Sequence, residues 1–174
     1  MKRVIGFGAA SAVVVILAVL GIATASASPP DDLRAAKAAS ARYHSIQQAF
    51  AAGYVQGSPC EQIPGLGGMG FHYVNPPLLG DDGLDPLRPE ILLYAPKPNG
   101  RLELVGVEYF KVDADQNLET DDDRPFMFGQ PFDGPMLGHA PGMPIHYDLH
   151  VWFWRDNPSG LFAPWNPSVV CPAP

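Results

Sequence analysis

The stretch 144–154 (PIHYDLHVWFW) carries two of the five histidines of the chain. If this stretch is a β-strand, its side chains alternate between two faces, so His146, Asp148 and His150 share one face. The other side chains are aromatic or aliphatic: Trp152 and Trp154 on the histidine face, and Tyr147, Leu149, Val151 and Phe153 on the opposite face. The alternation predicts one apolar face and one face able to carry chemistry.

Imidazole and carboxylate groups are common ligands of divalent transition metals. In a straight strand His146 and His150 are about 13 Å apart, at roughly 3.3 Å per residue, which is too far to share one ion. One of them can bind together with Asp148, unless a bulge or a helical turn brings the two histidines close enough to bind the same ion. The predicted ligand set for zinc, iron, manganese or copper is His72, Glu108, His146, Asp148 and His150, with Asp148 as a ligand or as the partner of a ligand.

The same residues also fit a buried hydrogen-bond network, because buried polar groups need partners whether or not they bind a ligand. In that case the chain is a structural or interaction protein of the cell envelope. A metal-dependent enzyme is the third alternative and requires an open coordination position. The chain has no GxSxG, HExxH, Walker or CxxCH motif, so the sequence predicts no particular reaction.

Two further groups are weaker candidates. Thioether and imidazole groups together suit copper, and such a set is formed by Met136, His139, Met143 and His146. Methionine also fills gaps in cores, so a packed loop is the alternative.

The segment 113–117 (DADQN) begins like a calcium-binding loop. It departs from that pattern at the sixth position, which is Leu118, and at the twelfth, which is Arg124. An acidic turn without calcium is therefore the preferred interpretation.

The N-terminus has the features of an export signal. Lys2 and Arg3 precede an apolar run over 4–22, and Ala25-Ser26-Ala27 is a small-residue cleavage motif. We expect cleavage after Ala27 and a mature domain over 28–174 outside the cytoplasm. The alternative is an uncleaved anchor, since the apolar run approaches the roughly 20 residues that a spanning helix needs.

Loss of residues 1–27 removes two basic side chains and no acidic one, so 9 Lys and Arg and 18 Asp and Glu remain, a net charge of −9. This charge repels phosphate backbones and anionic lipids, so we expect no nucleic-acid partner and no stable membrane insertion after cleavage. A metal ion or a small molecule is the expected partner. The length suits a single domain.

The only two cysteines, Cys60 and Cys171, predict a disulfide in an oxidising compartment. Two thiolate metal ligands are the alternative, but the chain has no CxxC spacing.

The elements that must position these groups follow from periodicity. Apolar residues every three or four positions predict one helix over 31–52, ended by Gly53, and glycine and proline predict a loop over 53–70. Strands are expected over 69–74, 90–95, 102–111 and 145–154, with a hairpin turn at 97–100 and an irregular tail joined to the sheet by Cys171. On the strand over 102–111, Leu102, Leu104, Gly106, Glu108 and Phe110 are expected to share one face.

The segments GMGFHYVN (68–75), LRPE (87–90), VGVEY (105–109) and 144–171 resemble a family of exported bacterial proteins without an assigned activity. The resemblance covers most of the mature chain and implies export, but no reaction. A looser similarity is to cupins, small β-barrels that hold a metal with three histidines and a glutamate. The order here departs from their compact HxH and downstream glutamate.

Together these patterns predict an α+β domain, with one N-terminal helix packed on a small, mostly antiparallel sheet or barrel over about 69–171, and one disulfide.

Overall fold

The computed structural model describes residue 1 and residues 29–172. Apart from Met1, the predicted signal peptide and its cleavage point lie outside these residues. The helical elements are α1 (Pro29–Ser40), the 3-10 helix η1 (Ala41–His44), α2 (Ile46–Ala51) and α3 (Pro76–Leu79). The strands are β1 (Val55–Ile63), β2 (Gly67–Val74), β3 (Ile91–Pro96), β4 (Leu102–Val112), β5 (Phe126–Met127), β6 (Gln130–Pro131), β7 (Asp133–Met136) and β8 (His146–Val151).

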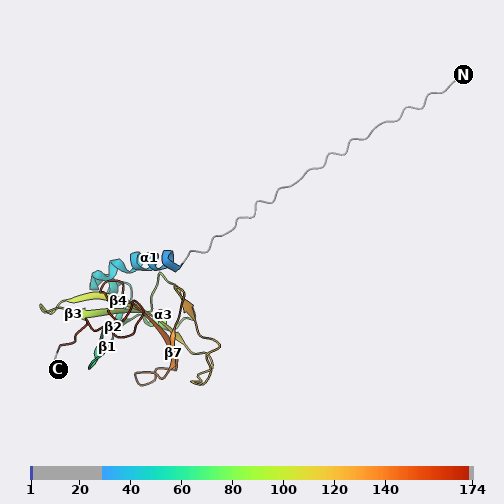
Figure 1. Ribbon diagram of the computed structural model, residues 1–174. Coiled ribbons are helices and arrows are strands. Elements are labelled where there is room, and N and C mark those ends of the chain that lie inside the picture. The colour runs from blue at the N-terminus through green and yellow to red at the C-terminus, as the bar shows by residue number, and fades with distance from the viewer. Residues whose placement is uncertain (2–28, 173–174) are drawn as a thin grey trace.

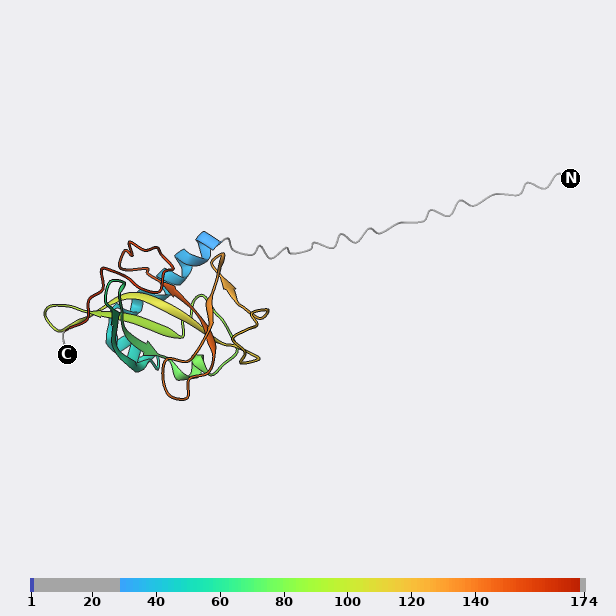
Figure 2. The ribbon, with the colours of Figure 1, turned by 60° about the horizontal axis from the view of Figure 1, so that its bottom comes forward.

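Six strands form one antiparallel sheet in the order β1-β2-β3-β4-β8-β7, and β5 and β6 form a separate pair. The sheet curls into a half-barrel, and α1 lies along one side of it (Figure 1, Figure 2). The predicted α+β class, the antiparallel sheet and the hairpin at 97–100 are confirmed: the Lys97 N–H donates to the Arg101 carbonyl at 2.7 Å.

The two faces of the sheet carry two separate apolar cores. The larger core joins the helices to the sheet and includes Ala36, Tyr43, Ala49, Leu92, Tyr94, Leu104, Val107, Tyr109, Tyr147, Leu149 and Val151. The smaller core lies on the opposite face and contains Ile91, Leu93, Ala95, Val105, Phe110, Trp152 and Val169. The predicted alternation along β8 is confirmed as far as Trp152. The histidine face therefore points away from the helices.

The prediction of one uninterrupted helix over 31–52 was wrong, because the chain is extended at Ser45, with φ −90° and ψ 111°. The break lies next to Tyr43, which contacts the sheet. Its side chain is buried, and its carbonyl accepts a hydrogen bond from the Tyr94 hydroxyl at 2.6 Å. This hydrogen bond ties the last turn of η1 to the sheet just before the break. Within the described residues, the segment 29–51 is thus helical in three pieces.

The prediction of a loop over 53–70 was also wrong, since β1 and the start of β2 lie there. β1 is an edge strand, and its register with β2 shifts between Gln56 and Cys60. Pro59 falls inside that irregularity, where the ladder needs no N–H donor. Glycine and proline therefore mark an irregular edge strand here, not a loop.

The expected face assignment on β4 was wrong for its first half. The register of β3 with β4 shifts at Leu93 and Tyr94, so Leu104 joins the helix-side core while Gly106 and Glu108 lie on the other face. A bulge of this kind inverts the side-chain alternation beyond it.

Trp154 was likewise placed on the wrong face. β8 ends at Val151, and the Trp154 ring packs against His44 on the helix side, with 4.5 Å between ring centroids.

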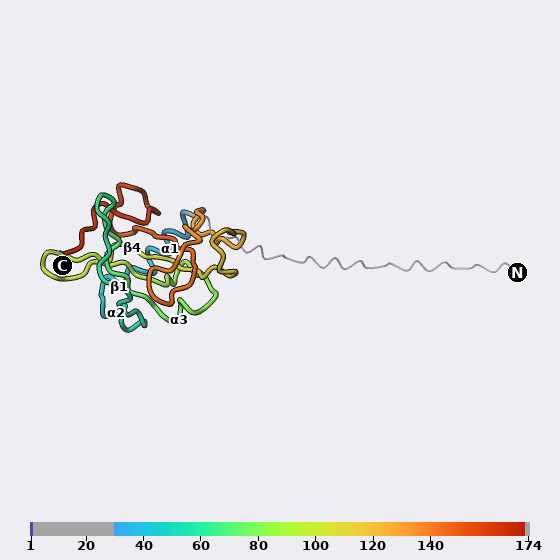
Figure 3. The backbone as a smooth tube through the Cα atoms, turned by 90° about the horizontal axis from the view of Figure 1, so that it is seen from below, coloured from blue at the N-terminus to red at the C-terminus, as the bar shows by residue number. Residues whose placement is uncertain are grey.

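The C-terminal segment runs beside β1 and β2, as the red and green tubes of Figure 3 show. Gly68 and Asn166 form a bridge, Val169 packs in the smaller core, and Cys60 and Cys171 form the predicted disulfide. Gly67 has φ +102°, and a Cβ there would lie 2.2 Å from the Asn166 carbonyl oxygen, so only glycine allows this approach.

Among the described residues, no helix has the length and apolar character needed to cross a bilayer.

Glu90 is a buried carboxyl group away from the histidine face, and it gives a pH-dependent prediction. Burial raises the pKa of Glu90 from 4.5 to about 7, although its Oε2 accepts the Phe110 N–H at 3.2 Å. Between these two pKa values the folded protein keeps a proton that the unfolded chain has released. Stability contributed by this group is therefore lost as the pH rises from about 4.5 to 7.

Glu90→Gln is expected to remove that loss, because the amide oxygen can still accept the backbone N–H. Urea unfolding at pH 4.5 and pH 7.5 should show the variant gaining up to about 3 kcal/mol over wild type at the higher pH. The exposed Glu119→Gln serves as the control. Equal pH profiles for Glu90→Gln and wild type would contradict the prediction.

Candidate metal centre

Three strands that are far apart in sequence bring His72, Glu108 and His150 together on the face opposite the helices. Glu108 of β4 and His150 of β8 are directly paired, and His72 of β2 is one strand further away, across β3. The curl of the sheet closes that gap. One ligand atom from each of the three side chains lies within 4.8 Å of the other two.

Both histidines present the same ring nitrogen to the glutamate. His72 Nε2 lies 3.4 Å from Glu108 Oε2, and His150 Nε2 lies 3.7 Å from the same oxygen. The second separation is beyond hydrogen-bond range. A tetrahedral ion with bonds of about 2.1 Å holds its ligand atoms about 3.4 Å apart. The three side chains are therefore close enough to hold one ion.

The outer nitrogen of each ring has its own oxygen neighbour. His72 Nδ1 lies 2.9 Å from the Ser58 hydroxyl and 3.9 Å from a Glu61 carboxylate oxygen, and His150 Nδ1 lies 3.5 Å from Asp148 Oδ1. Metal-binding histidines commonly donate the second N–H to such an oxygen, which sets the tautomer and the ring orientation. Asp148 therefore lies where a residue that orients a metal-binding histidine would lie.

Burial makes it costly to keep the side chains of this cluster charged. Relative exposure is 5% for Glu108 and 1% for His150. Burial raises the pKa of Glu108. Burial alone would lower the pKa of His150, but the Glu108 and Asp148 carboxylates outweigh it and raise this pKa to about 9. Burial, together with the charge of His150, lowers the pKa of His72 to about 3. Without an ion, protons on His150 and Glu108 offset the clustered charge, and metal binding has to displace them.

Within the described residues, several buried polar atoms of this cluster make no hydrogen bond: Glu108 Oε2, Asp148 Oδ1, and both ring nitrogens of His150. Unpaired buried groups of this kind cost about 1–3 kcal/mol each, so they call for a partner. The same atoms line a cavity of about 130 Å³, whose wall also includes Met69, Val74, Ile91, His139, Ala140 and Met143.

His146 does not join the three-residue group. It is fully buried, its ring stacks on Phe110 at 4.8 Å, and its Nδ1 lies 3.1 Å from the Pro144 carbonyl oxygen. Its ring nitrogens are not among the ligand atoms that lie within 4.8 Å of one another. Of the two histidines on β8, the close group therefore contains His150 and not His146.

The predicted copper group is brought together in part. The ring centroids of His139 and His146 are 5.1 Å apart, and the backbone nitrogen of His139 lies 3.3 Å from the Met143 sulfur, to which it donates. Met136 of β7 pairs with His146 of β8. His139 and Met143 also line the cavity beside His72.

The segment that begins like a calcium loop is a turn that uses its own carboxylates. Asp113 and Asp115 accept the Asn117 N–H at 2.9 and 3.0 Å, and Asp115 also accepts the Thr120 hydroxyl. These contacts leave the preferred interpretation, an acidic turn, in place. Asp113 is buried, however, so the turn is not solvated throughout.

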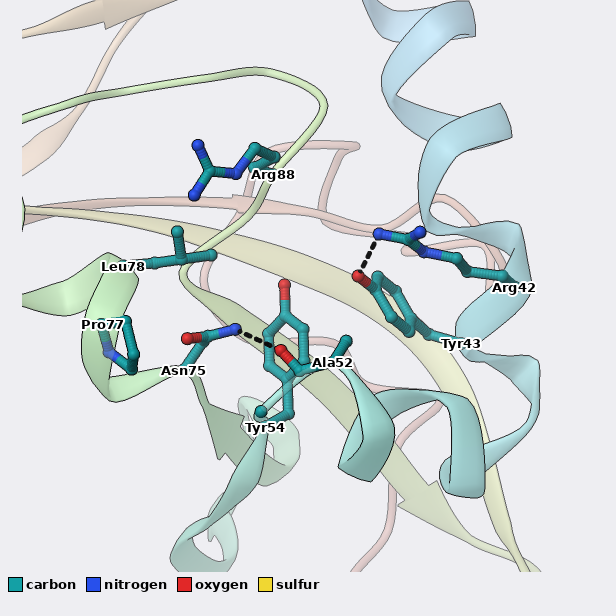
Figure 4. A pocket seen from close by; sticks show the side chains of 9 residues that line it. Arg42, Tyr43, Ala52, Tyr54, Asn75, Pro77, Leu78 and Arg88 are labelled. Carbon is teal, nitrogen blue, oxygen red and sulfur yellow. Dashed lines mark hydrogen bonds between the residues drawn. The ribbon is translucent and has the colours of Figure 1, made fainter.

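A larger cavity, of about 260 Å³, lies between α2 and α3 (Figure 4). Arg42 and Arg88 are at its rim, and Asn75 donates to the Ala52 carbonyl inside it at 3.0 Å. The Arg42 guanidinium already donates to the Tyr43 hydroxyl at 2.6 Å. Among the described residues, none of the unpaired buried polar atoms lines this cavity, so the smaller cavity is the better candidate for a binding site.

Ser58 and Glu61 are the members of the site that sequence analysis missed. Both lie in β1, in the segment predicted as loop, and the irregular register after Gln56 brings Ser58 beside His72. No periodic signal could have located them, because a bulged edge strand does not alternate.

No family model, curated protein or solved structure matches this chain. The resemblance to exported bacterial proteins therefore stays a prediction, and the site is interpreted from its own geometry.

Proposed function

We propose that this protein binds one divalent transition metal ion through His72, Glu108 and His150, with Asp148 orienting His150. Two imidazoles and one carboxylate suit zinc, iron, manganese or copper. Because the two histidines face Glu108 with Nε2 and an outer oxygen with Nδ1, the rings already have the orientation that ligation requires.

The observation that carries the proposal is the set of unpaired atoms. In a structural network the buried histidines and carboxylates would satisfy one another by hydrogen bonds. Here Glu108 Oε2 and His150 Nε2 have no such partner among the described residues, and they border a cavity. An ion between them supplies the missing partner.

The test is metal analysis by mass spectrometry on protein purified without chelator or affinity histidines, followed by titration of chelator-treated protein with Zn²⁺, Fe²⁺, Mn²⁺ and Cu²⁺. We expect one ion per chain in wild type and none in His72→Ala or His150→Ala. His44→Ala, on the helix face, is the matched control and should bind normally. Wild-type protein that takes up none of these ions, while the site variants lose thermal stability, would favour the structural network.

Asp148→Asn gives a graded prediction. The variant keeps the shape of the side chain but loses the charge that faces His150 Nδ1 at 3.5 Å. Since outer partners of metal-bound histidines are worth about 10- to 100-fold in affinity, we expect Zn²⁺ binding to weaken by that factor without being lost. Isothermal titration of Asp148→Asn beside Asp133→Asn, whose residue is the exposed neighbour on β7, would measure it. Equal affinities would show that Asp148 does not act through His150.

Export is part of the proposal. A disulfide between Cys60 and Cys171 suits an oxidising compartment, in agreement with the signal-like N-terminus. We propose that the chain is processed after Ala27 and acts outside the cytoplasm as an acidic domain that does not bind nucleic acid. The intact mass of the protein secreted by its own host tests the processing step: a retained N-terminus would contradict it.

A further inference from the structure

The candidate metal centre has three protein ligands and one open side. Residues 72, 108 and 150 are the only three-residue group of this kind among the described residues. A structural zinc site normally has four protein ligands, whereas a site that binds or converts a molecule keeps one position for it. The fourth neighbour of the ion therefore has to come from the cavity.

The outer atoms of the cluster do not supply that fourth ligand. Ser58 and Asp148 lie at the Nδ1 atoms of the two rings, away from the Nε2 atoms that face Glu108. His139 lines the cavity from the loop between β7 and β8, but its ring packs on His146 and is not part of the close group.

The cavity limits what can enter. At about 30 Å³ per water molecule, 130 Å³ accommodates about four waters, or a molecule of similar size. Beyond the metal ligands, one part of the wall is apolar, with Met69, Val74, Ile91, Ala140 and Met143, and the rest is polar, with Ser58, Glu61, His139 and Asp148. An oxygen or nitrogen donor can face the ion while a small apolar body lies against the apolar part of this wall.

We propose that the metal ion keeps one exchangeable position facing this cavity, and that the site takes a small molecule of about four non-hydrogen atoms, with one oxygen or nitrogen donor and an apolar body. This inference rests on the proposed metal binding.

The experiment uses the full-length mature protein loaded with Co²⁺, whose visible spectrum reports the ligands of the ion. Azide, acetate and benzoate are added in turn. We expect azide and acetate to change the spectrum with saturation, and benzoate to leave it unchanged because its ring exceeds the cavity. His139→Ala should keep the azide and acetate response, because His139 is not part of the ligand group, and His44→Ala, on the helix face, is the control that should respond to all three anions as wild type does.

Other outcomes separate the two proposals. Co²⁺ bound stoichiometrically with a spectrum that none of the anions alters would overturn the exchangeable position but leave metal binding in place. A response seen only in His139→Ala would show that His139 closes the site, and would also overturn it. An equal response to benzoate would overturn the size limit. If Co²⁺ and the other divalent ions are not bound at all, the metal centre itself is wrong.

Discussion

Glu108→Gln should abolish metal-dependent stabilisation while leaving the metal-free fold intact. Glutamine has the shape of glutamate but no charge, and a neutral amide is a poor ligand beside two imidazoles. Partners outside the ligand shell already account for about 10- to 100-fold in affinity, so removal of a ligand should cost at least about 100-fold. At a metal concentration of 100 times the wild-type Kd, wild type should gain about 2.7 kcal/mol in stability and the variant almost nothing.

Without metal, the free energy of unfolding of Glu108→Gln should stay within about 1 kcal/mol of wild type, for two reasons. The oxygen that faces the histidines makes no hydrogen bond that the substitution could break, and Asp148 still pairs with His150. A structural network predicts the reverse, a marked loss of stability that metal does not affect.

Urea unfolding with and without Zn²⁺ measures both quantities. Glu61→Gln is the matched control, since this glutamate lies at the cavity 3.9 Å from His72 Nδ1, on the outer side of the ring, and should keep most of the metal effect. A destabilised, metal-independent Glu108→Gln would contradict the metal centre.

Removal of the disulfide is expected to have the other large effect. The bond closes a loop with a sequence separation of 111 residues, and a loop of about 100 residues corresponds to about 4.7 kcal/mol in the loop-entropy model. Observed losses for native disulfides are about 2–5 kcal/mol.

Loss of the disulfide also releases the segment that places Val169 in the smaller core and Asn166 beside Gly68. The double variant Cys60→Ser/Cys171→Ser avoids a free thiol, and its urea midpoint should fall accordingly. Wild type treated with reductant is the control and should behave like the variant. A change below about 1 kcal/mol would contradict the prediction and would mean that the tail is held mainly by its packing.

Several features of the site follow from local sequence alone. A β-strand alternates with period two, so the pattern around His146, Asp148 and His150 was enough to predict that these side chains share a face and that, in a straight strand, the two histidines lie too far apart to share one ion. The cysteine pair was equally clear, because two cysteines have one way to pair. The hairpin turn at 97–100 could be predicted from its glycine and proline alone.

The errors arose where tertiary contacts override local preference. The helix over 31–52 is interrupted next to Tyr43, whose carbonyl accepts a hydrogen bond from Tyr94 of the sheet, a contact between residues 51 positions apart. β1 does not alternate because it is a bulged edge strand, so Ser58 and Glu61 carried no signal.

The sequence by itself determined which chemical groups are present, how they alternate along each strand, and that one disulfide joins the ends of the domain. Only the tertiary structure decided that His72, Glu108 and His150 meet, that Asp148 lies behind His150, and that His146 lies apart against Phe110. The physical reason is that strand order, a bulge in the β3–β4 register and the curl of the sheet set the distance between β2 and β8. These features arise from packing between distant segments, which no local pattern encodes.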